Sequence, residues 1–217
     1  MTAVTTERLV ALAYELAGWT DTPPDWMVYQ PGTRISSVLV GLEVGPADLF
    51  MARQLGYHAV VSYRPAGYAG PVGPRMARRI EAMMAAGLPR AVAIEASTPR
   101  ALAERAEAQA HNYDYAPSVA RMLETPFVTV YDPLAEVGRR TLRQRLDEHV
   151  RGLGAPTLAD LRDAVMTLPP FAQARTEPHP ALGDWSAPAG NIVVLDGAWG
   201  APSLDETRAY FAHGVTT

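Results

Sequence analysis

The sequence predicts an α/β fold, and three observations support this prediction. Short apolar runs rich in valine and isoleucine alternate with longer amphipathic stretches along the chain. Glycine, proline and capping residues separate the two kinds of segment, as is typical of βαβ units with a largely parallel sheet. The chain has 217 residues, of which 48% are apolar and 19% charged, so it has enough apolar surface to form a core.

The predicted strands are short apolar runs of the kind that parallel sheets bury on both faces. We expect five of them, at Val38–Val44, His58–Arg64, Ala91–Ala96, Phe127–Asp132 and Ile192–Asp196. Ligands of open parallel sheets bind at the carboxyl ends of the strands. The residues that follow these runs are therefore the first candidates for a functional site.

The predicted helices lie between these strands and have recognisable start and stop residues. Two of them, Pro46–Leu55 and Pro74–Ala86, are each followed by a glycine. Thr98 followed by Pro99 is typical of an N-cap and a first-turn proline. Capping-box spacing marks two further helix starts, at Thr157 with Asp160 and at Ser203 with Glu206.

The stretch Arg151–Ala189 differs from the rest of the chain because six prolines surround one predicted helix, Thr157–Leu168. We therefore expect a first α/β lobe over residues 1–150 and a smaller second lobe over residues 151–217 that begins with a proline-rich linker. Each lobe is expected to have a mostly parallel sheet flanked by helices. A helix followed by glycine and a strand recurs at Gly214–Thr217, which predicts a truncated C-terminal strand or one that another chain completes.

Composition excludes several function classes. The chain has no cysteine, which rules out disulfides, thiolate metal sites and a cysteine nucleophile. The net charge of -4 does not indicate a nucleic-acid or membrane partner. The N-terminus lacks the pattern of a signal peptide, and no apolar run reaches the roughly 18 residues of a membrane helix. We expect a soluble cytoplasmic protein.

The loop after the second predicted strand contains Tyr63 and Arg64, followed by Pro65. Arg64 and the glycines of the Gly67–Gly73 stretch are suited to a small anionic ligand, together with the helix N-terminus near Pro74. A tight loop with a surface arginine and a packed tyrosine explains the same residues. This second interpretation is favoured, because glycine-rich loops alone are weak evidence for binding.

Two further loops contain polar candidates. Asp132 and Glu136 are hard ligands for a divalent cation, but an N-cap at Asp132, with Glu136 near the start of the helix, explains them better. His111 and Asn112 either orient a ligand or form a turn before a helix, and the sequence favours neither interpretation. No two of the five histidines have the spacing of a local zinc-binding pair.

The order of these motifs resembles the Nif-three-like family, also described as GTP cyclohydrolase I type two-like or dinuclear-metal hexameric proteins. The resemblance spans nearly the whole chain in order. It rests on Pro23–Trp26, Val38–Val44, Leu55–Val61, Tyr63–Gly67, Asn112, Ala120–Leu123, Pro126–Tyr131, Thr157–Ala174 and Gly214–Thr216. It implies a two-lobed α/β fold, ring-shaped oligomers and two divalent metals in active members.

The resemblance also implies where the metal ligands of active members would fall. Their His-His pair falls on Tyr63 and Arg64, a later histidine on Tyr131 and an aspartate on Ala135. An aspartate of the first strand falls on Glu43, and the C-terminal His and Glu lie beyond Thr216. Because every expected ligand is replaced or lies outside the chain, the resemblance implies a divergent member without its metal site.

Three functional hypotheses follow. The first is a metal-free, non-catalytic protein that acts as an assembly or ligand-binding subunit, without a cofactor. The alternative is a GTP cyclohydrolase-like hydrolase of a nucleotide-like substrate, with zinc, iron or manganese held by residues such as Glu43, His111, Asp132 and Glu136. The third is a subunit of a homo-oligomer, or of a hetero-oligomer in which a related chain completes the sheet.

Overall fold

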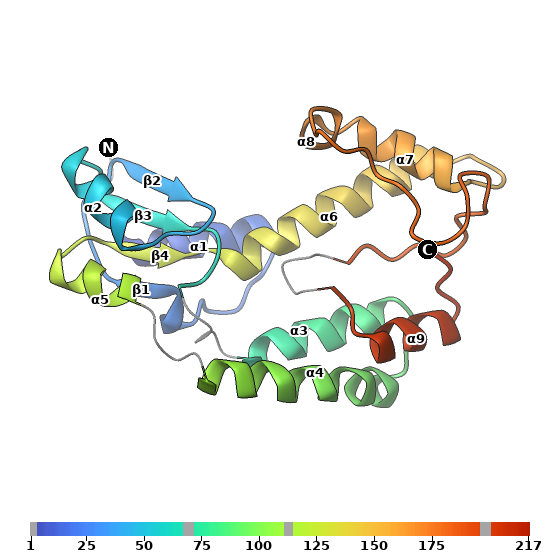
Figure 1. Cartoon of the computed structure of the whole chain (residues 1–217), viewed down its shortest axis with the longest axis horizontal. Coiled ribbons are helices and arrows are strands. Elements are labelled where there is room, and N and C mark those ends of the chain that lie inside the picture. Colours follow the sequence, from blue (N-terminus) through green and yellow to red (C-terminus); the bar gives the residue numbers. More distant parts are fainter. Residues whose placement is uncertain (1–3, 67–71, 111–114, 196–200) are drawn as a thin grey trace. The chain divides into compact units, whose positions relative to one another are not determined.

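The computed structural model describes residues 4–66, 72–110, 115–195 and 201–217 (Figure 1). By their internal contacts the residues group into two compact units. Unit 1 comprises Met1–Met76 and Pro99–Val137, and unit 2 comprises Ala77–Thr98 and Gly138–Thr217. The expected boundary at residue 150 differs from this grouping, because residues 77–98 and 138–150 pack with the C-terminal elements.

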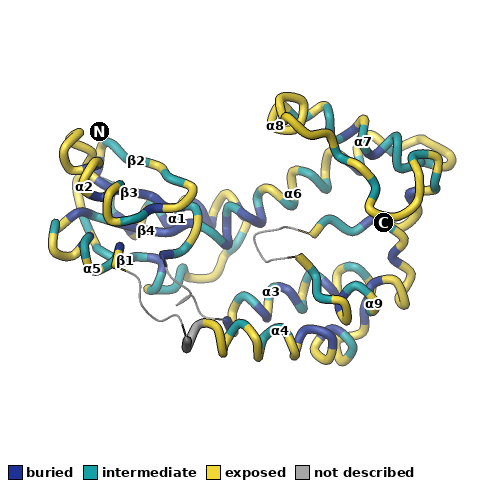
Figure 2. The backbone as a smooth tube through the Cα atoms, in the orientation of Figure 1, coloured by how far each residue is buried: buried dark blue, intermediate teal, exposed yellow. Residues whose placement is uncertain are grey.

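Unit 1 contains a four-stranded sheet with the order β1-β4-β3-β2. Its strands are β1 (Val28–Gln30), β2 (Val38–Gly41), β3 (Ala59–Ser62) and β4 (Phe127–Thr129). The pairs β2·β3 and β3·β4 are parallel, as predicted, whereas β1 pairs with β4 in the antiparallel sense. Every residue of β3 and β4 is buried, as expected for central strands covered on both faces (Figure 2).

Helices cover the two faces of this sheet, and the alternation of side chains along the strands decides which helix each residue contacts. Val60 and Phe127 pack with α2 (Pro46–Gln54) and α5 (Tyr115–Met122). Their neighbours in the chain, Val61 and Val128, point to the other face and pack with α1 (Thr6–Ala17). The apolar core of unit 1 therefore lies on both sides of the two central strands.

Unit 2 is built from helices. It contains α7 (Leu158–Met166), α8 (Pro169–Ala172) and α9 (Leu204–Ala212), with parts of α3 (Val72–Ala85), α4 (Arg90–Ala110) and α6 (Tyr131–Val150). Both predicted capping boxes are confirmed. The hydroxyl of Thr157 accepts from the Asp160 amide at 3.4 Å, and that of Ser203 accepts from the Glu206 amide at 3.2 Å.

The predicted strand at Ala91–Ala96 is wrong, because these residues belong to α4. Alanine occupies three of the six positions and favours a helix. Ala93 and Ala96, three residues apart, are buried on one helix face. The predicted helix start at Thr98 and Pro99 is wrong for the same reason: both lie inside α4, where the Thr98 hydroxyl donates to the Ile94 carbonyl at 2.7 Å.

The predicted strand at Ile192–Asp196 is not formed by its described residues, and Asp196 lies outside them. Only isolated hydrogen bonds connect this segment with the C-terminal residues. Val193 donates to Thr217 at 2.8 Å, and Thr216 donates to Asn191 at 2.9 Å. The described part of unit 2 therefore has no sheet, which corrects the expectation of a sheet in each lobe.

None of the helices in the described ranges combines the length and apolar character needed to span a bilayer.

Candidate functional site

The carboxyl ends of β2, β3 and β4 lie next to one another because hydrogen bonds continue past the strands. The Tyr63 amide donates to the Gly41 carbonyl at 2.8 Å, and the Val130 amide donates to Ser62 at 3.1 Å. Six predicted site residues follow these strand ends. They are Glu43, Tyr63, Arg64, Tyr131, Asp132 and Glu136.

The centre of this region is a pair of aromatic rings. Tyr63 and Tyr131 meet edge to face, with their ring centroids 5.3 Å apart and an interplanar angle of 69°. The guanidinium carbon of Arg75 lies 5.5 Å from the centroid of the Tyr131 ring, within the range of a cation–π interaction. The same arginine reaches Asp132, with Nε 3.4 Å from Oδ1. We call Tyr63, Arg75, Tyr131 and Asp132 the strand-end cluster.

The turn that presents Tyr63 is held by side chains from three strands. The Ser62 hydroxyl donates to the Arg64 carbonyl at 2.5 Å, and the Thr129 hydroxyl donates to the Tyr63 carbonyl at 3.3 Å. The Tyr29 hydroxyl accepts from the Ala66 amide at 2.8 Å. Because the backbone is bound on several sides, the position of the Tyr63 side chain is set by the sheet.

Arg64 lies at the rim of the cluster and forms an ion pair with Glu43. The two side chains are 55% and 68% exposed, so water screens the attraction between them. An exposed Arg64 next to a packed Tyr63 agrees with the interpretation of this loop as a tight turn without a ligand. The glycines at 67 and 70 lie outside the described residues, and ligand binding by Arg64 stays a prediction.

Asp132 and Glu136 both lie on α6 and are buried. The helix begins at Tyr131, so Asp132 is its second residue and not its N-cap, which corrects the prediction. A carboxylate in the first turn is favourable because the positive end of the helix dipole lies there. His111 and Asn112 lie outside the described residues.

Of the five positions in the chain that the resemblance implies for metal ligands, all but Glu43 have side chains that bind a divalent metal poorly. Arg64 has no lone pair to donate, Ala135 is a buried methyl group, and the Tyr63 and Tyr131 phenols would each have to lose a proton. Within the described ranges, no group of three or more His, Cys, Asp or Glu side chains is arranged to hold a metal ion. The guanidinium of Arg75 already places a positive charge beside Tyr131 and Asp132.

Arg75 is the site residue that sequence reasoning missed. It directly follows Pro74, at the helix start that we singled out for an anion, but nothing in the local pattern indicates its contact with Asp132. The two residues are 57 positions apart in the chain. One general rule could have pointed to Arg75: in an open parallel sheet the strand ends and the starts of the following helices lie at the same edge.

A largely parallel sheet with helices on both faces and a cluster at its strand ends defines an α/β protein of the open-sheet class. The chain is similar, with a TM-score of 0.90 and 38% sequence identity, to the crystal structure of a NIF3 superfamily protein from Sphaerobacter thermophilus. The match covers 99% of this chain and 79% of that one. No family model and no curated protein matches the sequence. The chain belongs to the NIF3 superfamily, which confirms the resemblance seen in the sequence.

Proposed function

We propose that this chain is a metal-independent member of the NIF3 superfamily that acts as a ligand-binding or assembly subunit and not as a hydrolase. The observation that supports the proposal is the strand-end cluster. Where the family resemblance implies metal-binding histidines, the chain has two packed tyrosine rings with an arginine over one of them.

The position of Arg75 opposes a divalent cation electrostatically. Two unit charges 5 Å apart interact by about 3 kcal/mol at an effective dielectric constant of about 20, and a divalent ion doubles this value. The Arg75 and Asp132 side chains are only 17% and 13% exposed, so water screens them weakly. Asp132 is thus paired with a cation of the protein, and Glu43 is paired with Arg64.

Calorimetric titration of zinc and manganese into chelator-treated protein tests the proposal. We expect no stoichiometric binding to the wild-type chain. A variant with Tyr63→His, Arg64→His, Tyr131→His and Ala135→Asp is the matched comparison, because it introduces the ligand types that the resemblance implies. Stoichiometric, saturable binding by the wild-type chain contradicts the proposal.

One observation favours the alternative of a metal-dependent hydrolase. Asp132 and Glu136 are buried carboxylates four residues apart on α6, which places them on one face of the helix. Carboxylate oxygens are the ligands that hard divalent cations prefer. If the wild-type chain binds manganese and hydrolyses GTP, and Asp132→Asn with Glu136→Gln abolishes both, the alternative replaces our proposal.

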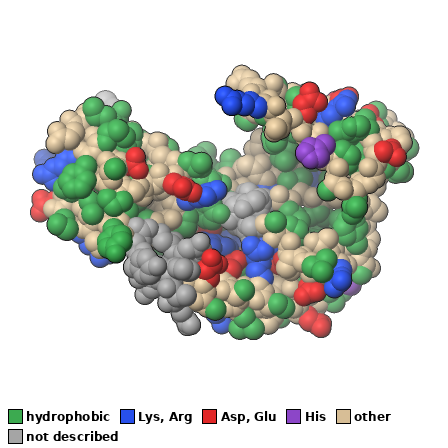
Figure 3. All heavy atoms as spheres, in the orientation of Figure 1, with side chains coloured by type: hydrophobic (Ala, Val, Ile, Leu, Met, Phe, Trp, Pro, Cys, Tyr) green, Lys and Arg blue, Asp and Glu red, His purple; other side chains and the backbone are tan. Residues whose placement is uncertain are grey.

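The proposed role in assembly is supported by the exposed apolar residues of unit 1. Val40 on edge strand β2 and Leu42, which directly follows this strand, are exposed. Phe50 and Met51 on α2 and Leu55 at its C-terminal end are also exposed. Hydrophobic side chains gather over this part of the molecule in Figure 3. Exposed apolar patches on an edge strand are typical of protein–protein contacts. Light scattering of the wild type and of Leu42→Asp tests this role, and two monodisperse monomers would contradict it.

A further inference from the structure

The sheet of unit 1 has two edges, and only one of them is protected against pairing with another strand. Edge strand β1 has a register shift between Val28 and Gln30 and ends before Pro31, and α5 packs against it. Irregular register, proline and a covering helix all discourage the addition of a strand. Edge strand β2 pairs with β3 without a register shift, and the stretch 36–42 contains neither proline nor a charged residue.

The backbone of β2 alternates between its neighbour β3 and the open edge. The carbonyls of Ser37 and Gly41 accept from amides of β3 and of the residue that follows it, at 3.2 and 2.8 Å. In a parallel ladder every second residue directs its polar groups to the same neighbour. Val38 and Val40 therefore present their amides and carbonyls to the open edge, where no further strand of the described residues pairs with them.

The side chains beside this open edge are apolar. Val40 is 67% exposed and Leu42 is 64% exposed. Val38 is two residues from Val40 and lies on the same face of the sheet. Pairs of β-branched side chains stabilise adjacent strands when they lie opposite each other. The edge of β2 therefore offers another strand both backbone hydrogen bonds and apolar contacts.

Hydrogen bonds fix the chain at the start of β2. The Ser36 amide donates to His58 Nδ1 at 3.3 Å, and the His58 amide donates to the Ser37 hydroxyl at 3.2 Å. The Ile35 amide donates to the Val4 carbonyl at 2.9 Å. Because the strand is formed before any partner binds, pairing costs little additional ordering.

This edge is complementary to a second copy of itself. If two β2 strands run antiparallel with Leu39 at the two-fold axis, Val38 of each copy lies opposite Val40 of the other. Each such pair consists of residues whose polar groups point to the open edge, so it exchanges both backbone hydrogen bonds. The same two-fold axis forms every contact twice.

The charges at the two ends of β2 favour this pairing. Arg34 lies five residues before Leu39 and Glu43 lies four residues after it, so an antiparallel pair brings Arg34 of one copy toward Glu43 of the other. Arg34 is exposed, and its side chain has no hydrogen bond or ion pair among the described residues. Glu43 is 68% exposed, and its carboxylate can accept from a second guanidinium in addition to Arg64.

We propose that unit 1 forms a two-fold dimer in which β2 pairs with β2 of a second copy in the antiparallel sense around Leu39 and joins the two sheets. This inference rests on the assembly role in the proposed function and specifies the partner and the contact. Stable interfaces bury roughly 1,200–2,000 Å², of which a pair of short strands supplies only a part. We therefore expect a weak dimer whose fraction rises with protein concentration.

Sedimentation velocity of the full chain over a range of protein concentrations tests the proposal. We expect a dimer that dissociates on dilution. Val40→Pro removes an amide that faces the open edge and should weaken dimerisation at least tenfold. Val40→Lys keeps the backbone intact and should also weaken it, because a charge at the edge opposes pairing.

Thermal unfolding identifies the variants that remain folded. A dimer that persists unchanged in either folded variant overturns the strand pairing but leaves the assembly role intact. A wild-type chain that stays monomeric at every concentration overturns both.

A charge exchange tests the antiparallel register. Arg34→Glu should weaken dimerisation several-fold, and the addition of Glu43→Arg should restore it, most clearly at low salt. Arg121→Glu is the matched control, because this exposed residue lies on α5, which packs against β1 at the opposite edge of the sheet. If Arg34→Glu dimerises as the control does, or if Glu43→Arg fails to restore the dimer, the register around Leu39 is wrong.

Discussion

The ion pairs Arg64–Glu43 in unit 1 and Arg79–Glu206 in unit 2 have the same chemical groups in opposite surroundings. The side chains of the first pair are 55% and 68% exposed, whereas those of the second are 8% and 0% exposed. Water screens the first pair and stabilises either partner if the other is removed. In the second pair each charge depends on its partner, because no solvent replaces a lost one.

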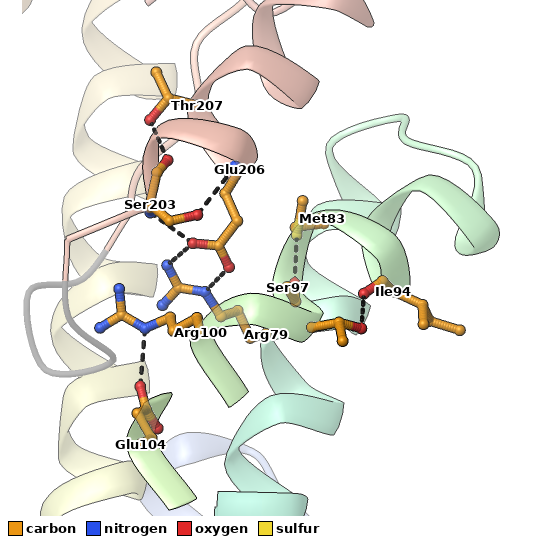
Figure 4. Close-up of polar contacts among 10 residues, drawn as sticks. Arg79, Met83, Ile94, Ser97, Arg100, Glu104, Ser203, Glu206 and Thr207 are labelled. Carbon is orange, nitrogen blue, oxygen red and sulfur yellow. Dashed lines mark hydrogen bonds and ion pairs between the residues drawn. The ribbon is translucent and has the colours of Figure 1, made fainter. Parts of the chain in front are cut away.

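This difference in exposure should appear as a difference in how much each pair stabilises its unit. The Arg79–Glu206 pair joins α3 to α9 inside unit 2 (Figure 4), so its main role is structural. The Arg75–Asp132 pair lies between these extremes and occupies the region where the family resemblance implies a metal. The four predictions that follow test this order, beginning with the largest effect.

Glu206→Ala should destabilise unit 2 by about 3–5 kcal/mol, because it leaves the buried Arg79 without its carboxylate and removes the carboxylate half of the capping box with Ser203. Urea unfolding followed by circular dichroism measures the effect. Glu43→Ala is the matched control for losing a glutamate from an arginine pair. Equal destabilisation by the two substitutions would contradict the comparison.

The buried pair should also make stability depend on pH. Burial raises the pKa of Glu206, but the hydrogen bonds from Arg79 and Ser203 outweigh burial and leave the pKa below its ordinary value of 4.5. The ionised form therefore stabilises the fold above pH 4.5. This contribution is lost as the pH falls through the lowered pKa. Wild-type protein should therefore lose more stability than Glu206→Gln between pH 7 and pH 3. If the unfolding temperatures of the two proteins fell by the same amount between pH 7 and pH 3, Glu206 would not be the group that links stability to pH.

Arg75→Ala should destabilise unit 1 by about 1–2 kcal/mol, since it removes the partner of Asp132 and the cation over the Tyr131 ring. Chemical unfolding monitored by tyrosine fluorescence measures the loss. Arg53→Ala, at an exposed position whose partner is a backbone carbonyl, is the control. No loss relative to this control would mean that the cluster is not energetically coupled.

The smallest effect is expected for the exposed pair. A double-mutant cycle with Arg64→Ala and Glu43→Ala should give a coupling free energy below about 1 kcal/mol that declines further in high salt. A coupling free energy above about 2 kcal/mol that does not change with salt would show that the pair is shielded from solvent.

Local sequence signals predicted much of unit 1 and the helix starts of unit 2. The apolar runs located β2, β3 and β4, and the capping residues located α7 and α9. The rule that the carboxyl ends of parallel strands lie at one edge of the sheet predicted the region of the candidate site. These features depend on neighbouring residues or on the general geometry of parallel sheets, so they can be predicted from a single sequence.

Other features depend on contacts that no local pattern encodes. Arg79 and Glu206 are 127 residues apart, and Arg75 and Asp132 are 57 apart, so neither pair was predicted. The segment Ala91–Ala96 is short and apolar enough to resemble a strand, and only its packing on Met83 and Leu88 shows a helical face. Strand β1 was missed because its three half-buried residues end in the polar Gln30 and lack the fully buried apolar run by which the equally short β4 was found.

The most direct test of the central claim is the metal content of the full chain purified without chelators, measured by mass spectrometry of the elements. We predict well below one equivalent of zinc, iron and manganese together per chain, because Tyr63 and Tyr131 occupy positions where the resemblance implies metal ligands and Arg75 places a positive charge over the Tyr131 ring. Two equivalents of a divalent metal per chain would contradict the account.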